Sequence, residues 1–229
     1  MSVLVIVPVA SHIEAPCELA LQILERAGHT VWRRWGHSDI ARGRSALATE
    51  ALAQGFDEIM WIDSDIAFDP ADVERLRSHG RPIVGGIYPV KGMRRLACQL
   101  LPGTKSVAFG KGGGLFEVRA APAGFLYTKR EVYERIRAHH ELPCCDDAEG
   151  AGVVPFFLSL VVPDERTPGK HRYLSEDFSF CERARACGYE ILMDSTIRLG
   201  HVGAYTYSWE DAGKALERHA SFKLVLNEP

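Results

Sequence analysis

An apolar run that ends abruptly in two carboxylates constrains this chain more than any other feature. Residues 57–65 read Asp-Glu-Ile-Met-Trp-Ile-Asp-Ser-Asp. The four residues from Ile59 to Ile62 have the length and character of a buried strand. Asp63 and Asp65 therefore stand at the carboxyl end of that strand, which is the edge where open α/β sheets bind ligands.

The two aspartates carry like charges that repel each other unless a cation compensates them. Carboxylate oxygens suit hard divalent ions such as Mg²⁺ and Mn²⁺, and a diphosphate is the natural ligand of such an ion. Asp63 and Asp65 therefore predict a metal and diphosphate site. The competing interpretation is a polar turn, in which the aspartate side chains accept hydrogen bonds from nearby backbone N–H groups.

The first 90 residues alternate between short apolar runs and stretches of helical periodicity. This order predicts a Rossmann-like, mostly parallel sheet with helices on both faces. The expected strands are 3–7, 30–35, 59–62 and 83–88, and the expected helices are 14–27, 40–53 and 70–79.

The pattern changes after Tyr88. Residues 91–114 are rich in glycine and basic residues, and 115–120 alternate as in an antiparallel strand. Further strands are expected at 123–128, 153–162 and 191–193, with helices at 129–139 and 175–188. The polar segment 163–172 is a candidate mobile lid. No repeat or linker divides the chain, so we expect a single domain over 1–229, with 1–90 continuous with 91–229.

Composition excludes several classes of protein. Hydrophobic residues make up 46% of the 229 residues, enough to bury a core. A net charge of −3 offers no electrostatic attraction to nucleic acid. No stretch of 18 apolar residues predicts a membrane span, and the N-terminus resembles a first strand more than a signal peptide.

The six cysteines form no CxxC pair, and reduced thiols in a cytoplasmic protein are the expectation. Cys144 and Cys145 are adjacent, which is not a zinc spacing. His139 and His140 lie nearby and raise the hypothesis of a metal site, although the stretch that follows has the polarity of a loop.

Two more groups of residues could carry chemistry. Ser175 is a good helix N-cap, so Glu176 and Asp177 fall in the first turn, where the helix dipole stabilises anions. In the functional interpretation Asp177 is a general base at the mouth of a cleft. His201 stands between Gly200 and Gly203, where a backbone can approach closely, and imidazole can bind Mn²⁺; a solvated histidine is the alternative.

A third candidate opens the second helix, where arginine conflicts with the helix dipole. A phosphate between the helix N-terminus and Arg42 or Arg44 would remove that conflict. In the alternative, both arginines simply point into solvent.

The order of these pieces resembles the GT-A glycosyltransferases, in particular the inverting group that contains the GT2-type enzymes. The resemblance runs from about residue 3 to 203. It rests on Asp63-Ser64-Asp65, Gly124-Phe125-Leu126 with Arg130-Glu131-Val132, Ser175-Glu176-Asp177, Gly188-Tyr189 and Gly200-His201-Val202-Gly203. It implies the GT-A fold with a small antiparallel element in the C-terminal half.

The resemblance also implies roles. Asp65 binds a Mn²⁺ or Mg²⁺ ion that bridges the diphosphate, Asp63 contacts the ribose or the metal, and His201 completes the metal shell. Asp177 is the catalytic base, with Glu176 beside it. The residues implied in binding the sugar nucleotide are Pro8, Val9, Ala10, Arg44, Asp63, Ser64, Asp65 and Gly124. Residues 1–90 then bind the sugar nucleotide, and 91–229 bind the acceptor.

The first strand departs from the family, because Val9-Ala10-Ser11-His12 replaces the usual Thr-Tyr-Asn-Glu type of sequence. Residues 83–91 are more similar to small viral and bacterial relatives than to polymer synthases. The implied function is a soluble, metal-dependent hexosyltransferase-like enzyme of class EC 2.4. It would move one sugar from a nucleoside-diphosphate sugar to the hydroxyl of a glycan or small-molecule acceptor, with inversion of configuration at the anomeric carbon.

Two alternatives remain at this point. A sugar-phosphate nucleotidyltransferase has a similar architecture, but residues 11–17 lack its glycine-rich phosphate loop with a basic residue. A non-catalytic module that binds sugar nucleotides is the second alternative. Asp63, Asp65, Asp177 and His201 are all present, which argues against such a loss of activity.

Overall fold

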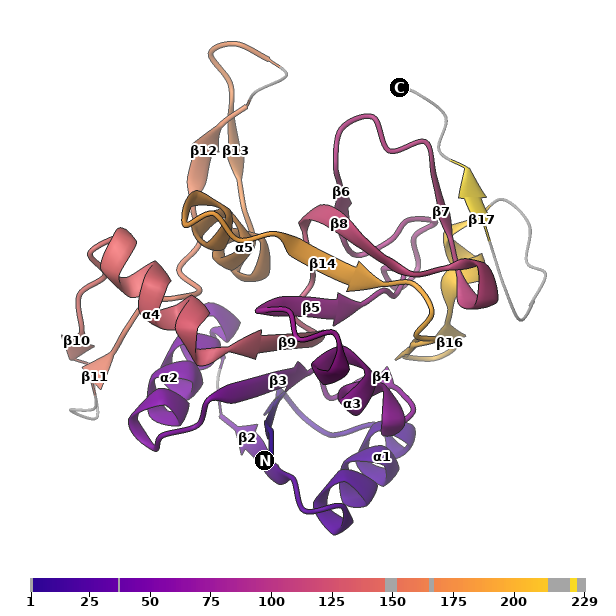
Figure 1. The fold of residues 1–229 in the computed structure, drawn as a ribbon, viewed down its shortest axis with the longest axis horizontal. Helices are drawn as coiled ribbons and strands as arrows, with labels where there is room; N and C mark the ends of the chain where they lie inside the picture. Colours follow the sequence, from indigo (N-terminus) through magenta and orange to yellow (C-terminus); the bar gives the residue numbers. More distant parts are fainter. Residues whose placement is uncertain (1, 37, 147–151, 165–166, 214–222, 226–229) are drawn as a thin grey trace.

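The computed structural model describes residues 2–36, 38–146, 152–164, 167–213 and 223–225. Its centre is an eight-stranded sheet in the order β2-β1-β3-β9-β5-β14-β8-β6 (Figure 1). These strands are β1 (Leu4–Val9), β2 (Thr30–Trp35), β3 (Glu58–Ile62), β5 (Ile83–Gly86), β6 (Gln99–Leu100), β8 (Leu115–Ala120), β9 (Phe125–Lys129) and β14 (Ile191–Asp194).

Strands β2, β1, β3, β5 and β14 run in one direction, as expected from the alternation of strands and helices. Strand β9 comes from the second half of the chain and enters antiparallel between β3 and β5. Strand β8 pairs antiparallel with β14 at the other side. The sheet therefore draws on both halves of the sequence.

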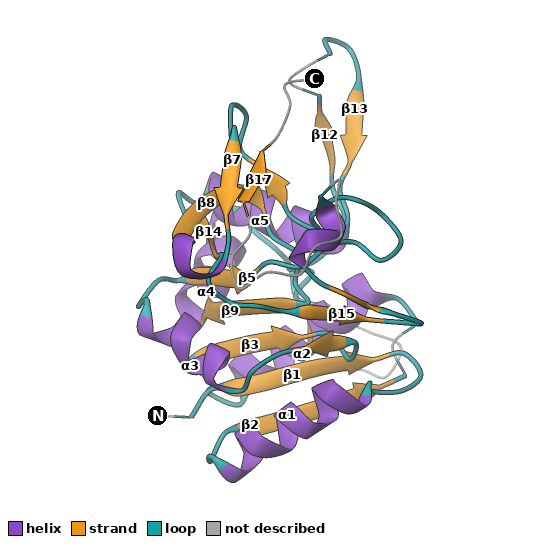
Figure 2. Ribbon diagram, turned by 90° about the vertical axis from the view of Figure 1, so that its right-hand side faces the viewer, coloured by secondary structure: helices purple, strands orange, loops and turns teal. Residues whose placement is uncertain are grey.

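Helices cover both faces of this sheet (Figures 1 and 2). Helices α1 (Ala15–Arg26) and α3 (Ala71–Ser78) bury their apolar sides in one core, and α2 (Ile40–Ala53), α4 (Arg130–His139) and α5 (Glu176–Ala186) in the other. Successive side chains of β1 alternate between the two cores, with Val5 and Val7 in the first and Leu4 and Ile6 in the second. The continuous apolar run of this strand follows from burial on both faces.

The remaining strands form small antiparallel sheets, as expected for the C-terminal half. They are β4 (Ile66–Ala67) with β15 (Gly200–Val202) and β16 (Thr206–Tyr207), β7 (Ser106–Ala108) with β17 (Lys223–Val225), β10 (Cys145–Asp146) with β11 (Gly152–Val153), and β12 (Val161–Pro163) with β13 (His171–Tyr173). Two short 3₁₀ helices are η1 (Gly110–Gly112) and η2 (Trp209–Ala212).

The prediction of a strand at 153–162 is wrong. Only its two ends are extended, in β11 and β12. The apolar residues between them turn into the core, where Phe157 stacks on Phe180 at 4.7 Å between ring centroids and meets Trp61 edge-on. The Phe157 N–H donates to the Ser45 hydroxyl of α2 at 3.1 Å. This segment is apolar because it fills the space between α2 and α5.

The expected lid, residues 163–172, belongs to the β12–β13 hairpin, which projects from the top of the molecule in Figure 1. Residues 165 and 166 of this segment lie outside the described residues. Within the described chain, no helix is both long enough and apolar enough to cross a bilayer.

Candidate active site

A cavity of about 320 Å³, here called cavity A, lies where the sequence predicts the diphosphate site. The end of β1, the start of α2, the turn after β3 and the start of α5 form its walls. Its lining residues are Pro8, Val9, Ala10, Ser38, Ile40, Arg44, Asp63, Ser64, Asp65 and Glu176. Seven of these were expected to bind a sugar nucleotide, so the fold brings them together.

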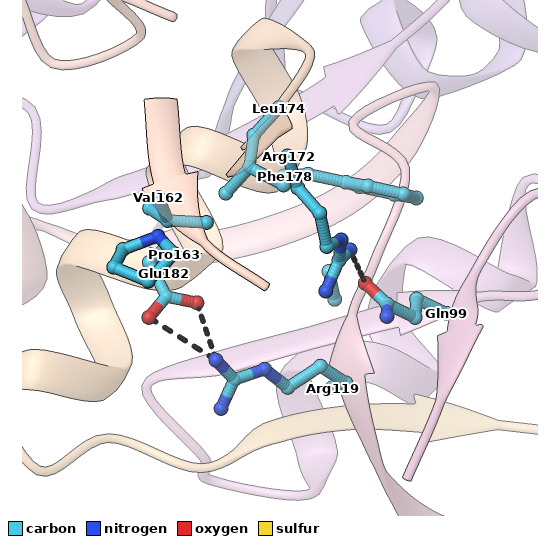
Figure 3. Close-up of a pocket in the computed structure, with 9 residues that line it drawn as sticks. Gln99, Arg119, Val162, Pro163, Arg172, Leu174, Phe178 and Glu182 are labelled. Atoms are coloured by element: carbon cyan, nitrogen blue, oxygen red, sulfur yellow. Dashed lines mark hydrogen bonds and ion pairs between the residues drawn. The ribbon is translucent and has the colours of Figure 1, made fainter. Parts of the chain in front are cut away.

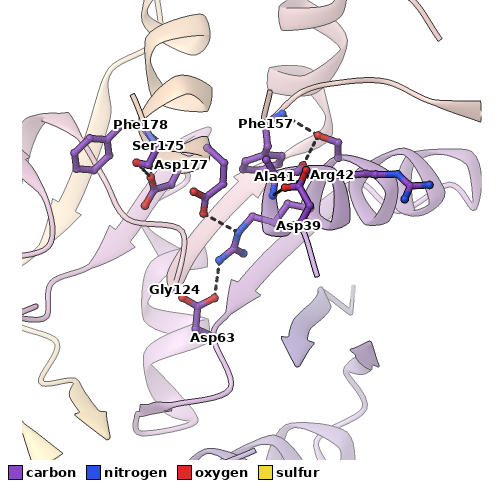
Figure 4. A network of polar contacts seen from close by, with 12 residues as sticks. Asp39, Ala41, Arg42, Asp63, Gly124, Phe157, Ser175, Asp177 and Phe178 are labelled. Atoms are coloured by element: carbon purple, nitrogen blue, oxygen red, sulfur yellow. Dashed lines mark hydrogen bonds and ion pairs between the residues drawn. The ribbon is translucent and has the colours of Figure 1, made fainter. Parts of the chain in front are cut away.

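Arg44 occupies the floor of cavity A and is only 2% exposed. Its Nη2 donates to Oδ1 of Asp63 at 2.6 Å, and its Nε lies 3.6 Å from Oε1 of Glu176 (Figure 4). Burial opposes the charged form, but the two carboxylates outweigh it and raise the pKa of Arg44. Among the described residues, its Nε and Nη1 have no hydrogen-bond partner. Such orphaned donors are costly unless an anion satisfies them.

The start of α2 differs from what the dipole argument predicts. Asp39 caps the helix, because its carboxylate accepts from the backbone N–H groups of Ala41 and Arg42. The N-terminus therefore needs no phosphate of its own. Arg42 is exposed, whereas Arg44 points inward, so the solvent alternative is wrong for Arg44.

Asp65 is held by two basic side chains. The Nζ of Lys91 lies 2.5 Å from its Oδ2, and the Nε2 of His201 lies 3.6 Å from the same oxygen. Partial burial opposes ionisation, but the contacts with His201 and Lys91 outweigh it and lower the pKa of Asp65 to about 2. Asp65 is therefore ionised at neutral pH.

A backbone carbonyl fixes the orientation of the His201 ring. Its Nδ1 lies 2.9 Å from the carbonyl oxygen of Pro89, which can only accept, so Nδ1 carries the proton. The other ring nitrogen, Nε2, faces Asp65 at 3.6 Å from Oδ2. A histidine that donates its other N–H to a backbone carbonyl is the usual arrangement of a metal ligand.

The donor set at this point fits a divalent ion, with one carboxylate and one oriented imidazole. The residues that would hold it are Asp65 and His201. Asp63 directs its Oδ1 to Arg44 instead, so its role toward a metal stays a prediction. Lys91 forms an ion pair with Asp65, so it would compete with the metal ion for that carboxylate.

Glu176 and Asp177 open α5 and face different cavities. Glu176 lines cavity A. Its pKa is raised, first by burial and then by the charge of Asp177, although the charge of Arg44 opposes this shift. Asp177 lines a second, larger cavity of about 910 Å³, here called cavity B. Its Oδ1 accepts from the hydroxyl of Ser175 and from the Phe178 N–H at 2.8 Å (Figure 4). These contacts fix the carboxylate at the boundary of the two cavities.

Gly124 lies against the same centre. Its carbonyl accepts from the Asp63 N–H at 2.9 Å, and its N–H donates to the Tyr88 hydroxyl at 3.1 Å. A Cβ at this position would come within 2.2 Å of the Tyr88 hydroxyl and 2.7 Å of Oδ2 of Asp63. Glycine is therefore required for the close approach of β9 to Asp63, although it is not among the residues that line cavity A.

Sequence reasoning missed Lys91 as a site residue, together with Tyr88, which lies between Gly124 and His201. The Tyr88 ring meets the His201 imidazole edge-on at 5.1 Å, and burial raises its hydroxyl pKa well above the usual value. The available signal was the placement of Tyr88-Pro89-Val90-Lys91 directly after strand β5. A basic residue at that edge of the sheet is a candidate partner for the two aspartates.

The possible metal site near His139 contains a different cysteine from the two that are adjacent in the sequence. The potential ligand atoms of His139, His140 and Cys187 all lie within 4.8 Å of one another. Cys144 and Cys145 are not part of this group. The Nε2 of His140 also contacts the Arg183 carbonyl at 3.1 Å, and all six cysteines have free thiols.

Three aromatic residues near the C-terminus could stack on a sugar or pack into the core, and these are Tyr205, Tyr207 and Trp209. Trp209 packs into the core against Phe109, at 5.2 Å between ring centroids. Tyr205 and Tyr207 contact each other edge-on. None of the three lines cavity A or cavity B.

Comparisons with known proteins identify the fold. No protein-family model matches the sequence, and no curated protein matches it. The crystal structure of A197 from STIV is similar at 17% identity over all of this chain and 96% of that one, with a TM-score of 0.56. This likeness and the topology confirm the expected fold class, an α/β GT-A-like fold.

Two further solved structures are more distant. UDP-glucose pyrophosphorylase complexed with UDP-glucose is 9% identical, over 88% of this chain and 93% of that one, with a TM-score of 0.43. A glycosyltransferase involved in the glycosylation of the major capsid of PBCV-1 is 12% identical, over 58% of this chain and 62% of that one, with a TM-score of 0.30.

Proposed function

We propose that this protein is a metal-dependent glycosyltransferase, which moves one sugar from a nucleoside-diphosphate sugar to an acceptor hydroxyl with inversion. The observation that carries the proposal is the junction of two cavities at consecutive residues. Glu176 lines cavity A beside the aspartates, and Asp177 lines cavity B. A transferase needs such a donor pocket and acceptor pocket, with a base between them.

Cavity A has the chemistry of a diphosphate site. The Nε and Nη1 of the buried Arg44 have no hydrogen-bond partner among the described residues, which favours an anionic ligand here. A guanidinium matches the geometry of phosphate oxygens well. Pro8, Val9 and Ala10 supply the part of the wall where a nucleoside would lie. Lys91 adds a second cation close to Asp65.

The metal is part of the proposal. A Mn²⁺ or Mg²⁺ ion held by Asp65 and His201 would stabilise the charge of the departing diphosphate. The orientation of His201 by the Pro89 carbonyl supports this assignment. Asp63 serves the site through Arg44, whose guanidinium it holds in place at 2.6 Å.

Asp177 is the proposed general base. It accepts the proton of the acceptor hydroxyl as the oxygen attacks the anomeric carbon. The new C–O bond forms while the bond from that carbon to the diphosphate oxygen breaks, and the nucleoside diphosphate leaves with the electron pair. Attack from cavity B on a sugar held in cavity A takes place on the face opposite the leaving group, which gives inversion.

The test is the identity of the products. UDP-, GDP-, CDP- and dTDP-sugars are each incubated with the protein, Mn²⁺ and a panel of simple sugars as acceptors. We expect release of a nucleoside diphosphate and an anomeric NMR signal of inverted configuration. Pyrophosphate release from a nucleoside triphosphate and a sugar phosphate would identify a nucleotidyltransferase instead. Binding of a sugar nucleotide without any product would identify a non-catalytic module.

A further inference from the structure

Cavity B continues beyond the proposed base toward the β12–β13 hairpin. A third cavity of about 350 Å³, here called cavity C, lies beneath that hairpin (Figure 3). Gln99, Arg172 and Phe178 line both cavity B and cavity C. The shared wall makes one extended surface that begins at Asp177 and ends under the hairpin.

The charges along this surface are unequal. Arg95 and Arg172 line cavity B, whereas Asp177 is the only carboxylate among its described lining residues. The nearby pair of Arg119 and Glu182 in cavity C neutralises itself, because Nη2 of Arg119 donates to both carboxylate oxygens at 3.2 and 2.9 Å (Figure 3). Among the described residues that line cavity B, Arg95 and Arg172 therefore outnumber the single carboxylate.

Arg172 stands at the junction of the two cavities. Its Nη2 donates to the Oε1 of Gln99 at 3.0 Å (Figure 3). An amide oxygen is neutral, so this bond orients the guanidinium and leaves its charge uncompensated. A guanidinium held in this way presents its remaining N–H groups to a planar carboxylate or to a phosphate.

Apolar side chains adjoin this cation. Phe178 follows Asp177 directly on α5 and is shared by both cavities, and Leu174 lines cavity C. An aromatic ring next to hydrogen-bonding groups suits the mixed apolar and polar faces of a sugar ring. A neutral sugar would use these groups but would leave the guanidinium of Arg172 without an anionic partner.

We infer that the acceptor is an anionic saccharide, whose carboxylate or phosphate group binds Arg172 while one of its hydroxyl groups lies at Asp177. This inference rests on the proposed transferase function, because it names the substrate class of the same site. Arg95, which is exposed on the wall of cavity B, is the second cation that such an acceptor meets.

The test measures sugar binding without any donor. Glucose, glucuronic acid and glucose 6-phosphate are titrated separately into the wild type, Arg172→Gln and Arg26→Gln by isothermal titration calorimetry. Arg26 is exposed at the end of α1 and lines neither cavity, so its variant controls for the change in net charge. We expect one of the acidic sugars to bind the wild type at least about tenfold more tightly than glucose, a difference of about 1.4 kcal/mol.

Arg172→Gln should abolish that preference, and Arg26→Gln should keep it. Whichever of glucuronic acid and glucose 6-phosphate binds more tightly shows whether the site prefers a carboxylate or a phosphate. Equal affinity for glucose, no binding of either acidic sugar, or an unchanged preference in Arg172→Gln would overturn the inference. UDP, GDP, CDP and dTDP are titrated into the same samples. Nucleotide binding without an anion preference contradicts this inference alone, whereas an anion preference without nucleotide binding contradicts the proposed function.

Discussion

The guanidinium of Arg44 lies 2.6 Å from the carboxylate of Asp63, at the floor of a cavity, and two of its three nitrogens have no hydrogen-bond partner among the described residues. Burial of a charged group is tolerated only when its hydrogen-bonding capacity is used. Asp63 and Glu176 compensate the charge, whereas the buried Nε and Nη1 donors stay without a hydrogen-bond partner among the described residues. This arrangement prepares a site for an anion.

Replacing Lys91 should strengthen metal binding. In the protein without metal, its ammonium group lies 2.5 Å from the Asp65 carboxylate, so an incoming ion must displace it. A half-exposed ion pair is worth up to about 1 kcal/mol. Lys91→Met should therefore raise the affinity for Mn²⁺ alone by about fivefold, as measured by electron paramagnetic resonance of free Mn²⁺.

Lys105→Met, at an exposed position outside cavities A, B and C, is the matched control and should leave the Mn²⁺ affinity unchanged. Unchanged or weaker Mn²⁺ binding by Lys91→Met would show that Lys91 does not compete with a metal for Asp65.

Replacing the base should separate turnover from donor binding. Asp177→Asn keeps the shape of the side chain but cannot accept the proton, so turnover should fall by about 10² to 10⁴-fold. Asp177 lines cavity B and not cavity A, so the affinity for the nucleoside diphosphate should stay within about twofold. Steady-state kinetics and calorimetry measure the two quantities. Glu134→Gln, on the exposed side of α4, is the control, and a near-normal rate in Asp177→Asn would refute the base assignment.

The packing of Gly124 can be tested by rescue. Gly124→Ala places a methyl group within 2.2 Å of the Tyr88 hydroxyl, so it should lower the free energy of unfolding by about 1–3 kcal/mol. Tyr88→Phe removes that hydroxyl oxygen. In the Tyr88→Phe background, the cost of Gly124→Ala should therefore be smaller, although the contact with Asp63 remains. Urea denaturation of the four proteins measures the cycle, and an equal cost in both backgrounds would argue against this contact.

Asp72 should make stability depend on pH. Its side chain is 10% exposed, and burial, followed by the charge of Asp69, raises its pKa from 3.8 to about 6. The folded state then holds the proton more tightly than the unfolded state, so the free energy of unfolding should fall as pH rises from about 4 to about 6.

Asp72→Asn removes this titration. We expect it to flatten that part of the stability curve and to raise the free energy of unfolding at pH 7 by about 3 kcal/mol. Urea denaturation at a series of pH values checks both effects. If the free energy of unfolding of the variant depends on pH as steeply as that of the wild type, groups other than Asp72 cause the dependence.

Much of the donor half follows from local pattern. The β3 segment is apolar on both faces and ends in polar residues, so its burial and the position of Asp63 and Asp65 at the sheet edge were predictable. The same holds for α2, whose predicted bounds match the structure. Short-range periodicity records which faces of an element are buried, whichever part of the chain those faces contact.

Other features depend on contacts between distant parts of the chain. Strand β9 enters between β3 and β5, and no local pattern specifies which neighbours a strand will take. The apolar residues around Phe157 had a strand-like composition but fill a gap between helices. Lys91 reaches Asp65 across 26 residues of sequence, a partnership that no spacing rule describes.

The most direct measurement is calorimetric titration of UDP, GDP, CDP and dTDP into the wild type and Arg44→Lys, each with Mn²⁺. Lysine keeps the charge near Asp63 but lacks the planar fork of guanidinium donors. We predict that the wild type binds one of the four nucleotides and that Arg44→Lys, shown to be folded by circular dichroism, binds it at least about tenfold more weakly. No binding of any of the four by the wild type, or equal affinity in the variant, would contradict the assignment of cavity A as the donor site.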